Sequence, residues 1–531
     1  HQEPAPMPLS RRTFLSGSAA AGALLVASGT GTLSRPLGGR AHAAEQTGRA
    51  SRLFPGTRVA HADLHNHSLL SDGKGKAESA FASMRAAGID VAALTDHSTI
   101  SKALPGAARE LTCASSCSLA GIDEQAWETT GRLADAADAR GAFTAIRGFE
   151  WSSPTLGHVN VWFSQDWIDP LSTVGNTTGE GVAQFLHEVP GAGPAIAPTV
   201  DQAVRVVPAN GAGMRGFYEW LARDPATPVL SGGADGIFGF NHPGREPGRF
   251  GYFSYDERLR DRLVSIEVFN RGEDYLFEGV DQGFASPIAE CLDAGWRVGL
   301  SGVSDEHGTD WGYPDGKGRT GLWVTELSRA GVREAMEARR FFSTRLRGLR
   351  VDAAANGVRM GQTLGHRSGD VQFQLDVDRG AVWWGRRLQV QVLQTGRPLP
   401  TVVHTEEVVV PRDDQPVIAF RAPVDVENGR WVVLRILDAE QERDGRAPEG
   451  VDVFGGAVAY AAPFFLDPDA APAALPSSSS RTGEVAPSTL ARTADGTGTA
   501  ARTLPSTGPG TAAAVGAAAL AAGAAVRAST R

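Results

Sequence analysis

Short apolar runs alternate with stretches of helical periodicity between residues 57 and 345. Lys76–Gly88 predicts a helix, because Phe81 and Met84 share one face and a glycine follows the last turn. The run Val91–Leu94 that comes next predicts a buried strand. Strand, polar tip and helix then repeat along this part of the chain, which is typical of a parallel (β/α) barrel. The pattern therefore predicts an α/β fold.

The pattern changes to period-two alternation between residues 346 and 466. Polar residues alternate there with Val371, Phe373, Leu375 and Val377. Turn residues separate several such runs, so we predict a small all-β sandwich domain. Residues 467–503 are rich in Ala, Pro, Ser and Thr, and this composition predicts a disordered linker.

The first 43 residues have the pattern of an export signal. Ser10-Arg11-Arg12-Thr13-Phe14-Leu15 matches the twin-arginine motif, an Ala/Gly/Leu run follows, and Ala41-His42-Ala43 offers a small-x-small cleavage site. We therefore expect an exported protein that uses the twin-arginine export machinery. That route resembles the one taken by proteins that fold and load cofactors before export.

Residues 504–531 have the order of a cell-wall sorting signal. Leu504-Pro505-Ser506-Thr507-Gly508 has the LPxTG form that sortase recognises, and a weakly apolar Ala/Gly stretch and terminal arginines follow. We expect sortase as a partner, peptidoglycan attachment, and an extracellular or wall-anchored location in a Gram-positive bacterium. The alternative is a low-complexity tail with a chance pentapeptide, because the stretch is short and weakly hydrophobic for a membrane stop.

Composition narrows the classes of function. The net charge of -9 and the absence of a basic stripe argue against a nucleic-acid-binding surface. Cys113 and Cys117 could form a small disulfide loop in an exported protein, whereas Cys291 in a helical pattern is expected to be a buried apolar residue. Isolated histidines such as His61 are expected to lie at the surface.

Metal-ligand residue types stand at or just past the ends of the apolar runs. The candidates are His65, His67, Asp72, His97, Glu150, His158, His242, Asp305 and His307. Imidazoles and carboxylates are the ligands that borderline divalent cations prefer. In (β/α) barrels, chemistry collects at the carboxyl ends of the strands. His158 has an alternative interpretation as a packed strand residue.

These motifs resemble those of the PHP (polymerase and histidinol phosphatase) superfamily. The shared features are the His-x-His near the first strand, the strand-end His97, the glutamate Glu150, the Asn-His-Pro histidine His242 and the late Asp-x-His, over residues 60 to 310. The resemblance implies a distorted (β/α)7 TIM-like barrel over residues 57–345. It also implies two or three divalent ions, Mn, Zn or Fe.

The resemblance further implies a ligand set for each ion. His65 and His67 would hold one ion with Glu150 and Asp305. Glu150 would also reach a second ion held by His158 and His242. A third position would take Asp72, His97 and His307, although relatives often carry a histidine where Asp72 stands. Asp96 and Glu267 would orient the ligand histidines from outside the cluster.

We therefore expect an exported metal-dependent phosphoesterase in which a metal-activated water attacks a small-molecule phosphate ester. Glu150, Asp305 and His307 are the candidate catalytic residues, and Lys74, Arg245 and Arg271 are candidate phosphate-binding residues. A hydrolase of carbamate or carboxylate esters is an alternative. A wall-anchored binding protein with a non-catalytic barrel is another, as is a structural barrel like those fused to polymerases.

Overall fold

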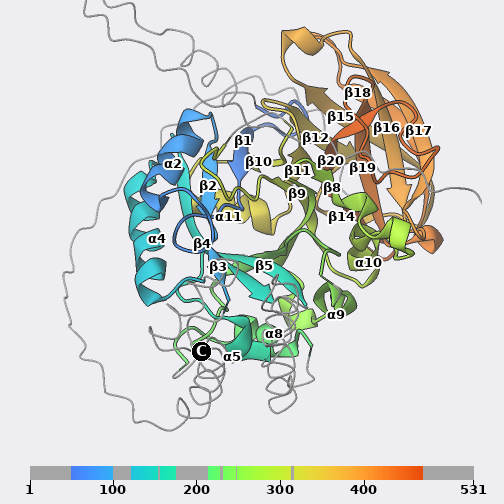
Figure 1. The fold of residues 1–531 in the computed structure, drawn as a ribbon. Helices are drawn as coiled ribbons and strands as arrows, with labels where there is room; N and C mark the ends of the chain where they lie inside the picture. The colour runs from blue at the N-terminus through green and yellow to red at the C-terminus, as the bar shows by residue number, and fades with distance from the viewer. Residues whose placement is uncertain are drawn as a thin grey trace, which may run out of the picture. The chain divides into compact units, whose positions relative to one another are not determined.

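The computed structural model describes residues 50–99, 121–153, 156–174, 213–227, 231–246, 248–312 and 316–470, which are coloured in Figure 1. All of them belong to one structural unit, residues 43–531. The predicted export signal, nearly all of the predicted linker, the predicted sorting signal, Cys113 and Cys117 lie outside the described residues. No helix in the described ranges has both the length and the apolar character needed to cross a membrane.

The N-terminal half contains alternating strands and helices. They are β1 (Arg58–Asp63), α2 (Ala77–Ala86), β2 (Val91–Leu94), β3 (His97–Ser98), α4 (Glu124–Ala137), β4 (Thr144–Ser153), β5 (Gly157–Trp162), α5 (Pro170–Val174), α8 (Arg215–Ala222), β6 (Ile237–Phe240), α9 (Arg249–Phe253), β7 (Leu263–Asn270), β8 (Glu273–Asp274), α10 (Pro287–Asp293), β9 (Gly299–Val303), β10 (Arg319–Val324), α11 (Arg329–Glu337) and β11 (Phe341–Thr344). The predicted helix over Lys76–Gly88 and the predicted strand over Val91–Leu94 are confirmed as α2 and β2. Gly88 follows the helix with φ +85°, a conformation that glycine adopts without strain.

The strands form a mixed ladder rather than an all-parallel one. β1 pairs in parallel with β2, β2 with β4, β6 with β7, and β7 with β9. β5, however, runs antiparallel to both of its neighbours, β4 and β6. The link from β4 to β5 spans residues 154–156, which is too short for a helical crossover and long enough for a hairpin. The chain is a mixed α/β protein with a large sheet.

The C-terminal half is built from strands, together called the β-domain here. They are β12 (Arg350–Ala355), β13 (Val358–Arg359), β14 (Thr363–Gly365), β15 (Ser368–Asp378), β16 (Arg387–Gln394), β17 (Thr401–Val409), β18 (Ile418–Asp425), β19 (Trp431–Asp438), β20 (Gly456–Ala461) and β21 (Phe464–Asp467). β13, β12, β15 and β18 form one sheet, and the remaining strands belong to the large sheet. The alternating residues Val371, Phe373 and Leu375 are fully buried in an apolar core with Leu388 and Val390.

The large sheet continues from the first half into the β-domain. β1 pairs with β10, β10 with β11, and β11 with β20, each antiparallel. Figure 1 shows the orange and red strands of the β-domain beside β9, β10 and β11. Val59, Trp323 and Phe342 of the first half share an apolar core with the β-domain. The two halves therefore have a common core.

Two expectations about single residues have definite outcomes. Cys291 is a free, buried thiol, as predicted. The expectation that His61 lies at the surface is wrong. His61 is buried because β1 is covered by β2 and β10 along its edges and by Phe342 at its side chain, with ring centroids 6.5 Å apart.

Candidate metal centre

The fold brings all nine predicted ligand residues into one cluster. His65 and His67 follow β1, and Asp305 and His307 follow β9. A parallel bridge between Asn66 and Glu306 places these two strand ends side by side. β3 pairs with β4 so that His97 lies opposite Glu150. The remaining two histidines come from the β5–β6 pair. They are His158, the second residue of β5, and His242, the second residue after β6.

Glu150 lies at the centre of the cluster and is fully buried. Its carboxylate oxygens lie 2.6 Å from His97 Nδ1, 3.2 Å from His65 Nε2 and 3.2 Å from His158 Nδ1. They also lie 3.3 Å from His242 Nε2 and 3.5 Å from His67 Nε2. One carboxylate therefore contacts five imidazoles, which is the arrangement that a bridging ligand requires.

Asp305 provides a second buried carboxylate on the other side of the paired histidines. Its Oδ1 lies 3.5 Å from His65 Nε2, 3.3 Å from His67 Nε2 and 3.3 Å from His307 Nδ1. The two Nε2 atoms of His65 and His67 are themselves 3.0 Å apart. This is a compact group of nitrogen and oxygen donors with the chemistry of a divalent-cation site.

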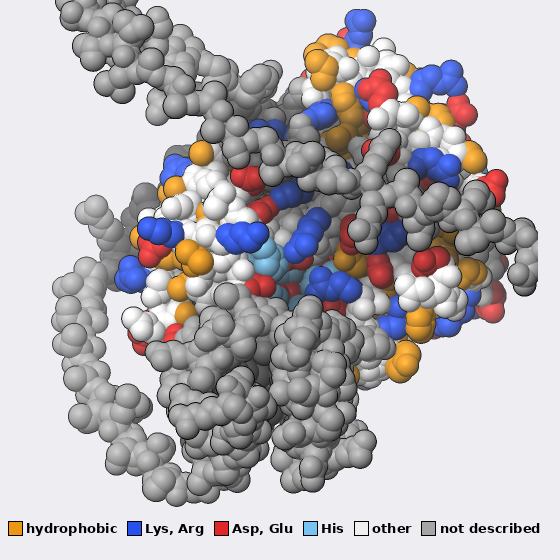
Figure 2. All heavy atoms as spheres, viewed as in Figure 1, with side chains coloured by type: hydrophobic (Ala, Val, Ile, Leu, Met, Phe, Trp, Pro, Cys, Tyr) orange, Lys and Arg blue, Asp and Glu red, His pale blue; other side chains and the backbone are white. Residues whose placement is uncertain are grey.

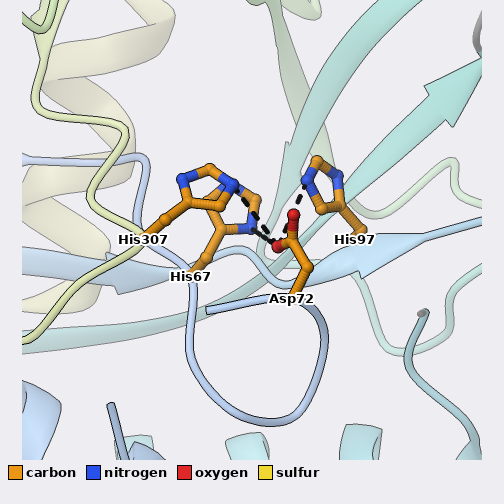
Figure 3. Close-up of side chains that lie close together, drawn as sticks. All are labelled: His67, Asp72, His97 and His307. Atoms are coloured by element: carbon orange, nitrogen blue, oxygen red, sulfur yellow. Dashed lines mark ion pairs between the residues drawn. The ribbon is translucent and has the colours of Figure 1, made fainter. Parts of the chain in front are cut away.

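Asp72 forms a separate group with three histidines, which Figure 3 shows converging on its carboxylate. Its Oδ1 lies 3.3 Å from His307 Nε2, 3.6 Å from His97 Nε2 and 3.9 Å from His67 Nδ1. The Ser71-Asp72-Gly73 loop brings it there because Ser71 Oγ donates to Asp96 Oδ1 at 2.6 Å. Asp72, His97 and His307, which the family resemblance assigned to a third ion, therefore lie together.

Whether a metal fits this site can be judged from the buried polar atoms that make no hydrogen bond. Among the described residues, such atoms include His67 Nδ1, Asp72 Oδ1, Glu150 Oε2, His242 Nδ1, Glu246 Oε2 and Asp305 Oδ1. Buried polar groups are nearly always paired, and an unpaired one calls for an explanation such as an ion. These six unpaired atoms belong to one cluster and are all metal-ligand types. The residues present therefore fit a metal centre.

The electrostatics of the cluster favour cations. Burial raises the pKa of Glu150 and of Asp305, but the surrounding histidines outweigh it and hold both pKa values well below their usual range. Burial and the neighbouring His97 and His307 lower the pKa of His67 to about 3, so this ring is neutral at pH 7 and its lone pair is available. Anionic carboxylates beside a neutral imidazole are the state in which metal ligands bind.

His65 and His242 have the opposite shift. Burial opposes their protonation, but Asp305 and Glu150 raise the pKa of His65 well above its ordinary value. Burial and Arg245 likewise lower the pKa of His242, yet the carboxylates of Glu246 and Glu150 raise it to about 9. Metal binding at these two histidines would therefore release protons.

Glu246 is a member of the cluster that sequence reasoning missed. Its oxygens lie 3.6 Å from His242 Nδ1 and 3.9 Å from His158 Nε2, and it is 8% exposed. The three residues form a group that could hold an ion. The only local signal was a carboxylate four residues after His242, and this spacing is common outside metal sites.

The two predicted outer carboxylates differ in role. Glu267 Oε1 lies 2.8 Å from His65 Nδ1, so it orients that ring as expected. Asp96 does not contact a histidine in this way. It accepts hydrogen bonds from Ser68 and Ser71 and so shapes the loop between His67 and Asp72. The expectation that Asp96 orients a ligand histidine is therefore wrong.

Three cationic residues predicted to bind phosphate lie in different settings. Arg271 is half exposed, and its guanidinium lies 3.3 Å from Asp305 Oδ2 and 3.1 Å from His307 Nδ1. Arg245 is 44% exposed, 2.8 Å from Glu246 and 3.1 Å from His242 Nε2. Lys74 is exposed, and its backbone N–H donates to the His307 carbonyl. Figure 2 shows Lys and Arg side chains bordering the visible histidines, where the surface is hollowed.

Three residues of the site have left-handed backbone conformations. The φ angles are +26° at His242, +51° at Arg271 and +47° at Asp305. Non-glycine residues rarely adopt such angles, which cost about 1–3 kcal/mol each and concentrate at functional sites. Arg271 directly follows β7, and His242 and Asp305 are each the second residue after a strand, where a sharp change of direction turns the side chain into the cluster.

One family model matches part of the chain. A family model described as "Protein of unknown function (DUF3604)" matches residues 50–188, a span that contains six of the nine predicted ligands. No curated protein matches the chain.

Two solved structures are similar to part of the chain. One is a two-domain protein from Bacteroides vulgatus containing a predicted PHP-like metal-dependent phosphoesterase, with 14% identity, a TM-score of 0.34, and coverage of 78% of this chain and 98% of that one. The other is an amidohydrolase from Chromobacterium violaceum with bound sulfate and no metal, with 19% identity, a TM-score of 0.26, and coverage of 53% and 97%. At these TM-scores, neither similarity supports an argument about this chain.

Proposed function

We propose that this protein is a metal-dependent hydrolase of phosphate esters that uses two or three divalent ions, Mn, Zn or Fe. One observation carries the proposal. Six of the buried polar atoms that make no hydrogen bond in the described residues belong to the cluster around Glu150, and arginines stand at the rim of the same cluster. A cation cluster bordered by arginines favours an anionic substrate.

The residues divide into three groups that would hold ions. The central group is His65, His67, Glu150 and Asp305, the second is His158, His242 and Glu246 with Glu150, and the third is Asp72, His97, His307 and His67. Ions bound in such groups lower the pKa of water and stabilise negative charge on a reacting phosphoryl group. Glu150 is fully buried, so bulk water has little access to the centre of the cluster.

The arginines supply binding and orientation. Arg271 and Arg245 approach the cluster from two different loops, after β7 and after β6. Guanidinium groups bind phosphate oxygens through paired N–H donors, so two of them can fix the orientation of an ester relative to the cluster. Both are partly exposed and can exchange their present acceptors for those of a substrate.

His307 is placed to move a proton. It is the most exposed histidine of the cluster, and its pKa is raised because the nearby carboxylates of Asp72 and Asp305 outweigh the effect of burial. Its Nε2 lies 3.3 Å from Asp72 Oδ1. When only the first two groups hold ions, a proton at that nitrogen is available to a leaving alkoxide at neutral pH, whereas a third ion would take its place.

The test is to purify the mature chain, measure bound metal, and assay p-nitrophenyl phosphate. We expect two or three equivalents of metal, turnover that chelation removes, and a large loss of both metal and turnover in Glu150→Ala and Asp305→Ala. Turnover of p-nitrophenyl acetate or a carbamate ester alone would replace the phosphoesterase proposal with the ester alternative. Unchanged metal content in both variants would contradict the assigned site.

Two further proposals concern the fold and the location of the protein. We interpret the strands β1, β2, β4, β5, β6, β7 and β9 as a distorted seven-stranded PHP-type barrel, which the Asn66–Glu306 bridge supports. We also propose twin-arginine export and sortase attachment to peptidoglycan, supported by Arg11-Arg12 and the Leu504–Gly508 motif. Cell fractionation of wild type, Arg11→Lys with Arg12→Lys, and a variant without residues 504–508 tests this location.

A further inference from the structure

The β-domain reaches the hairpin that carries Arg271. Arg271 and Gly272 form the turn between β7 and β8, in which Phe269 pairs with Asp274. At the turn, Arg271 Nε donates to the Asp305 carbonyl at 3.3 Å, and its guanidinium contacts Asp305 and His307. The position of this hairpin therefore sets the position of Arg271 relative to the cluster.

Three β-domain side chains bind Asp274, three residues beyond Arg271. Tyr460 Oη donates to Asp274 Oδ2 at 2.7 Å. Asp444 Oδ2 accepts from the Asp274 backbone N–H at 2.8 Å, and Arg446 donates to the Asp274 carbonyl at 3.1 Å. The side chain, the amide and the carbonyl of one hairpin residue are all held by the other half of the molecule.

These β-domain residues are themselves fixed by buried partners. Arg435 Nε donates to Tyr460 Oη at 2.7 Å, and its guanidinium forms a fully buried ion pair with Asp452. The Tyr460 ring packs against Phe269 of β7, with centroids 5.2 Å apart. Buried networks in which each member has a partner are rigid, so this one can transmit a fixed position to the hairpin.

Arg271 depends on such support because its own geometry is costly. Its backbone is left-handed and its side chain is half exposed, and two main-chain hydrogen bonds hold it locally, from Arg271 N–H to the Val303 carbonyl at 3.1 Å and from Gly318 N–H to the Arg271 carbonyl at 3.0 Å. Arg245 lies 2.8 Å from Glu246, whereas the hairpin of Arg271 is also bound by the β-domain through Asp274. The two arginines at the rim are therefore held by different parts of the protein.

We propose that the β-domain is part of the anion-binding site, with Tyr460, Asp444 and Arg446 acting as positioning residues for Arg271. This inference rests on the proposed function, since it assigns Arg271 to the anionic group of the substrate. It gives the β-domain a role in the reaction site and does not require a separate ligand for that domain.

The experiment compares variants of the full, metal-loaded chain for binding of inorganic phosphate by calorimetry. Tyr460→Phe removes the hydroxyl that joins Arg435 to Asp274, and Arg446→Met removes the donor to the Asp274 carbonyl. Each is expected to weaken phosphate binding about tenfold while bound metal stays unchanged. The same substitutions in an Arg271→Ala background are expected to cause no further loss, because their effect passes through Arg271.

A matched control removes an interdomain hydrogen bond elsewhere. Thr395→Val deletes the hydrogen bond from Thr395 Oγ1 to Asp293 Oδ1, 2.8 Å, whose acceptor belongs to α10 and makes no hydrogen bond to Asp274. It is expected to leave phosphate binding unchanged. An equal loss in Thr395→Val, or an undiminished effect of Tyr460→Phe in the Arg271→Ala background, would overturn the inference.

Hydrogen exchange separates failure of this inference from failure of the proposed function. Faster amide exchange over residues 268–278 in Tyr460→Phe and in Arg446→Met, with residues 60–72 unchanged, supports the positioning role. Metal-loaded wild type that does not bind phosphate contradicts the phosphoesterase proposal, and the exchange result then decides whether the β-domain holds the hairpin. Unchanged exchange over 268–278 in both variants would contradict the inference on its own.

Discussion

Six histidines of the cluster have a carboxylate close to each ring nitrogen, and His67 and His307 have Asp305 on one side and Asp72 on the other. His65 directs Nε2 to Glu150 and Nδ1 to Glu267, while His158 and His242 have Glu150 on one side and Glu246 on the other. His97 has Glu150 on one side and Asp72 on the other. A carboxylate behind a ligand imidazole fixes which nitrogen is free for a metal and raises its basicity.

The first prediction concerns the carboxylates of Glu246 and Glu267. Glu246→Gln and Glu267→Gln keep the shape of the side chain and remove its charge. Each is expected to lower the affinity for one metal equivalent by about 10–100-fold, because Glu267→Gln removes the charge that orients His65 and Glu246→Gln removes an anionic ligand of the second ion. Competition with a metal-binding dye on the full chain measures this. Glu219→Gln, at an exposed residue of α8, is the control and should match wild type, and equal affinities in all variants would contradict the assignment.

The second prediction concerns His61. Burial and the nearby charge of Arg319 lower its pKa from 6.5 to about 4 in the folded protein. Between these pH values the unfolded chain binds more protons, so the free energy of unfolding falls as the pH falls, by up to about 3 kcal/mol from this residue. Urea unfolding of metal-free wild type and His61→Phe at several pH values measures the slope. His61→Phe should lose this part of it, and identical slopes would contradict the prediction.

At the scale of residues, the sequence predicts the candidate ligands that lie within short local motifs. His-x-His, Asp-x-His and Asn-His-Pro each stand at the end of an apolar run, and the structure brings their residues together. Glu246 could not be predicted in the same way, because one of its partners, His158, is distant in sequence. The burial of His61 also depends on β10, which pairs with β1 although the two strands are far apart in the sequence.

At the scale of elements, α9, which follows β6 on the way to β7, has an unusual backbone. Phe250, Gly251 and Tyr252 have left-handed angles, which oppose the normal preference of L-residues. Phe250 N–H donates to the Leu156 carbonyl at 2.6 Å, and its ring stacks on Phe240 with centroids 4.2 Å apart. The turn therefore joins the start of β5 to the end of β6, beside His158 and His242.

The third prediction concerns Gly157, which precedes His158. A Cβ there would lie 2.6 Å from the Phe250 ring, and φ is +111°. Gly157→Ala is expected to cost about 1–3 kcal/mol from the backbone angle, with a further loss from the clash and reduced metal binding at the neighbouring histidine. Gly369→Ala is a matched control, since Gly369 has the same φ and open space around it.

Urea unfolding and metal titration of both variants measure the difference. Gly369→Ala should show the backbone cost alone and bind metal as wild type does. Equal stability and equal metal binding in the two variants would show that Phe250 gives way and that the turn does not position His158.

Sequence periodicity predicts the regular elements better than this connection. α2 and β2 have clear apolar patterns and lie where the pattern placed them. Nothing local in Arg249–Phe253 except Gly251 favours a left-handed turn, since its stability comes from contacts with Leu156 and Phe240. The antiparallel direction of β5 likewise follows from the short connection after β4, a feature that the alternation of strands and helices does not contain.

At the scale of the whole molecule, the two halves share a sheet and a core. β11 pairs with β20 through Phe342–Ala461, Ser343–Tyr460 and Thr344–Ala459. The change of pattern near residue 346 marks where the alternation begins, but long-range strand pairing of this kind has no local signal. The sequence therefore predicts two kinds of structure and does not predict that one sheet joins them.

The fourth prediction is that the N-terminal half does not fold alone. A chain ending at Thr344 exposes Val59, Trp323 and Phe342, which are buried against the β-domain, and leaves one edge of β11 unpaired. Loss of this burial costs roughly 1.5–3 kcal/mol for each large apolar side chain, which is a substantial part of the stability of a domain. Soluble yield, near-ultraviolet circular dichroism and thermal unfolding measure the outcome. A cooperative, soluble fragment would contradict the prediction.

The edge pairing of β11 with β20 also restricts how the protein can admit a ligand. Many two-part enzymes close around their substrates by hinge bending, in which the parts rotate as rigid bodies. Here such a rotation would break main-chain hydrogen bonds between the strands and uncover apolar side chains. Rotation of the β-domain is therefore costly, and any substrate of the proposed reaction would have to reach Glu150 without it.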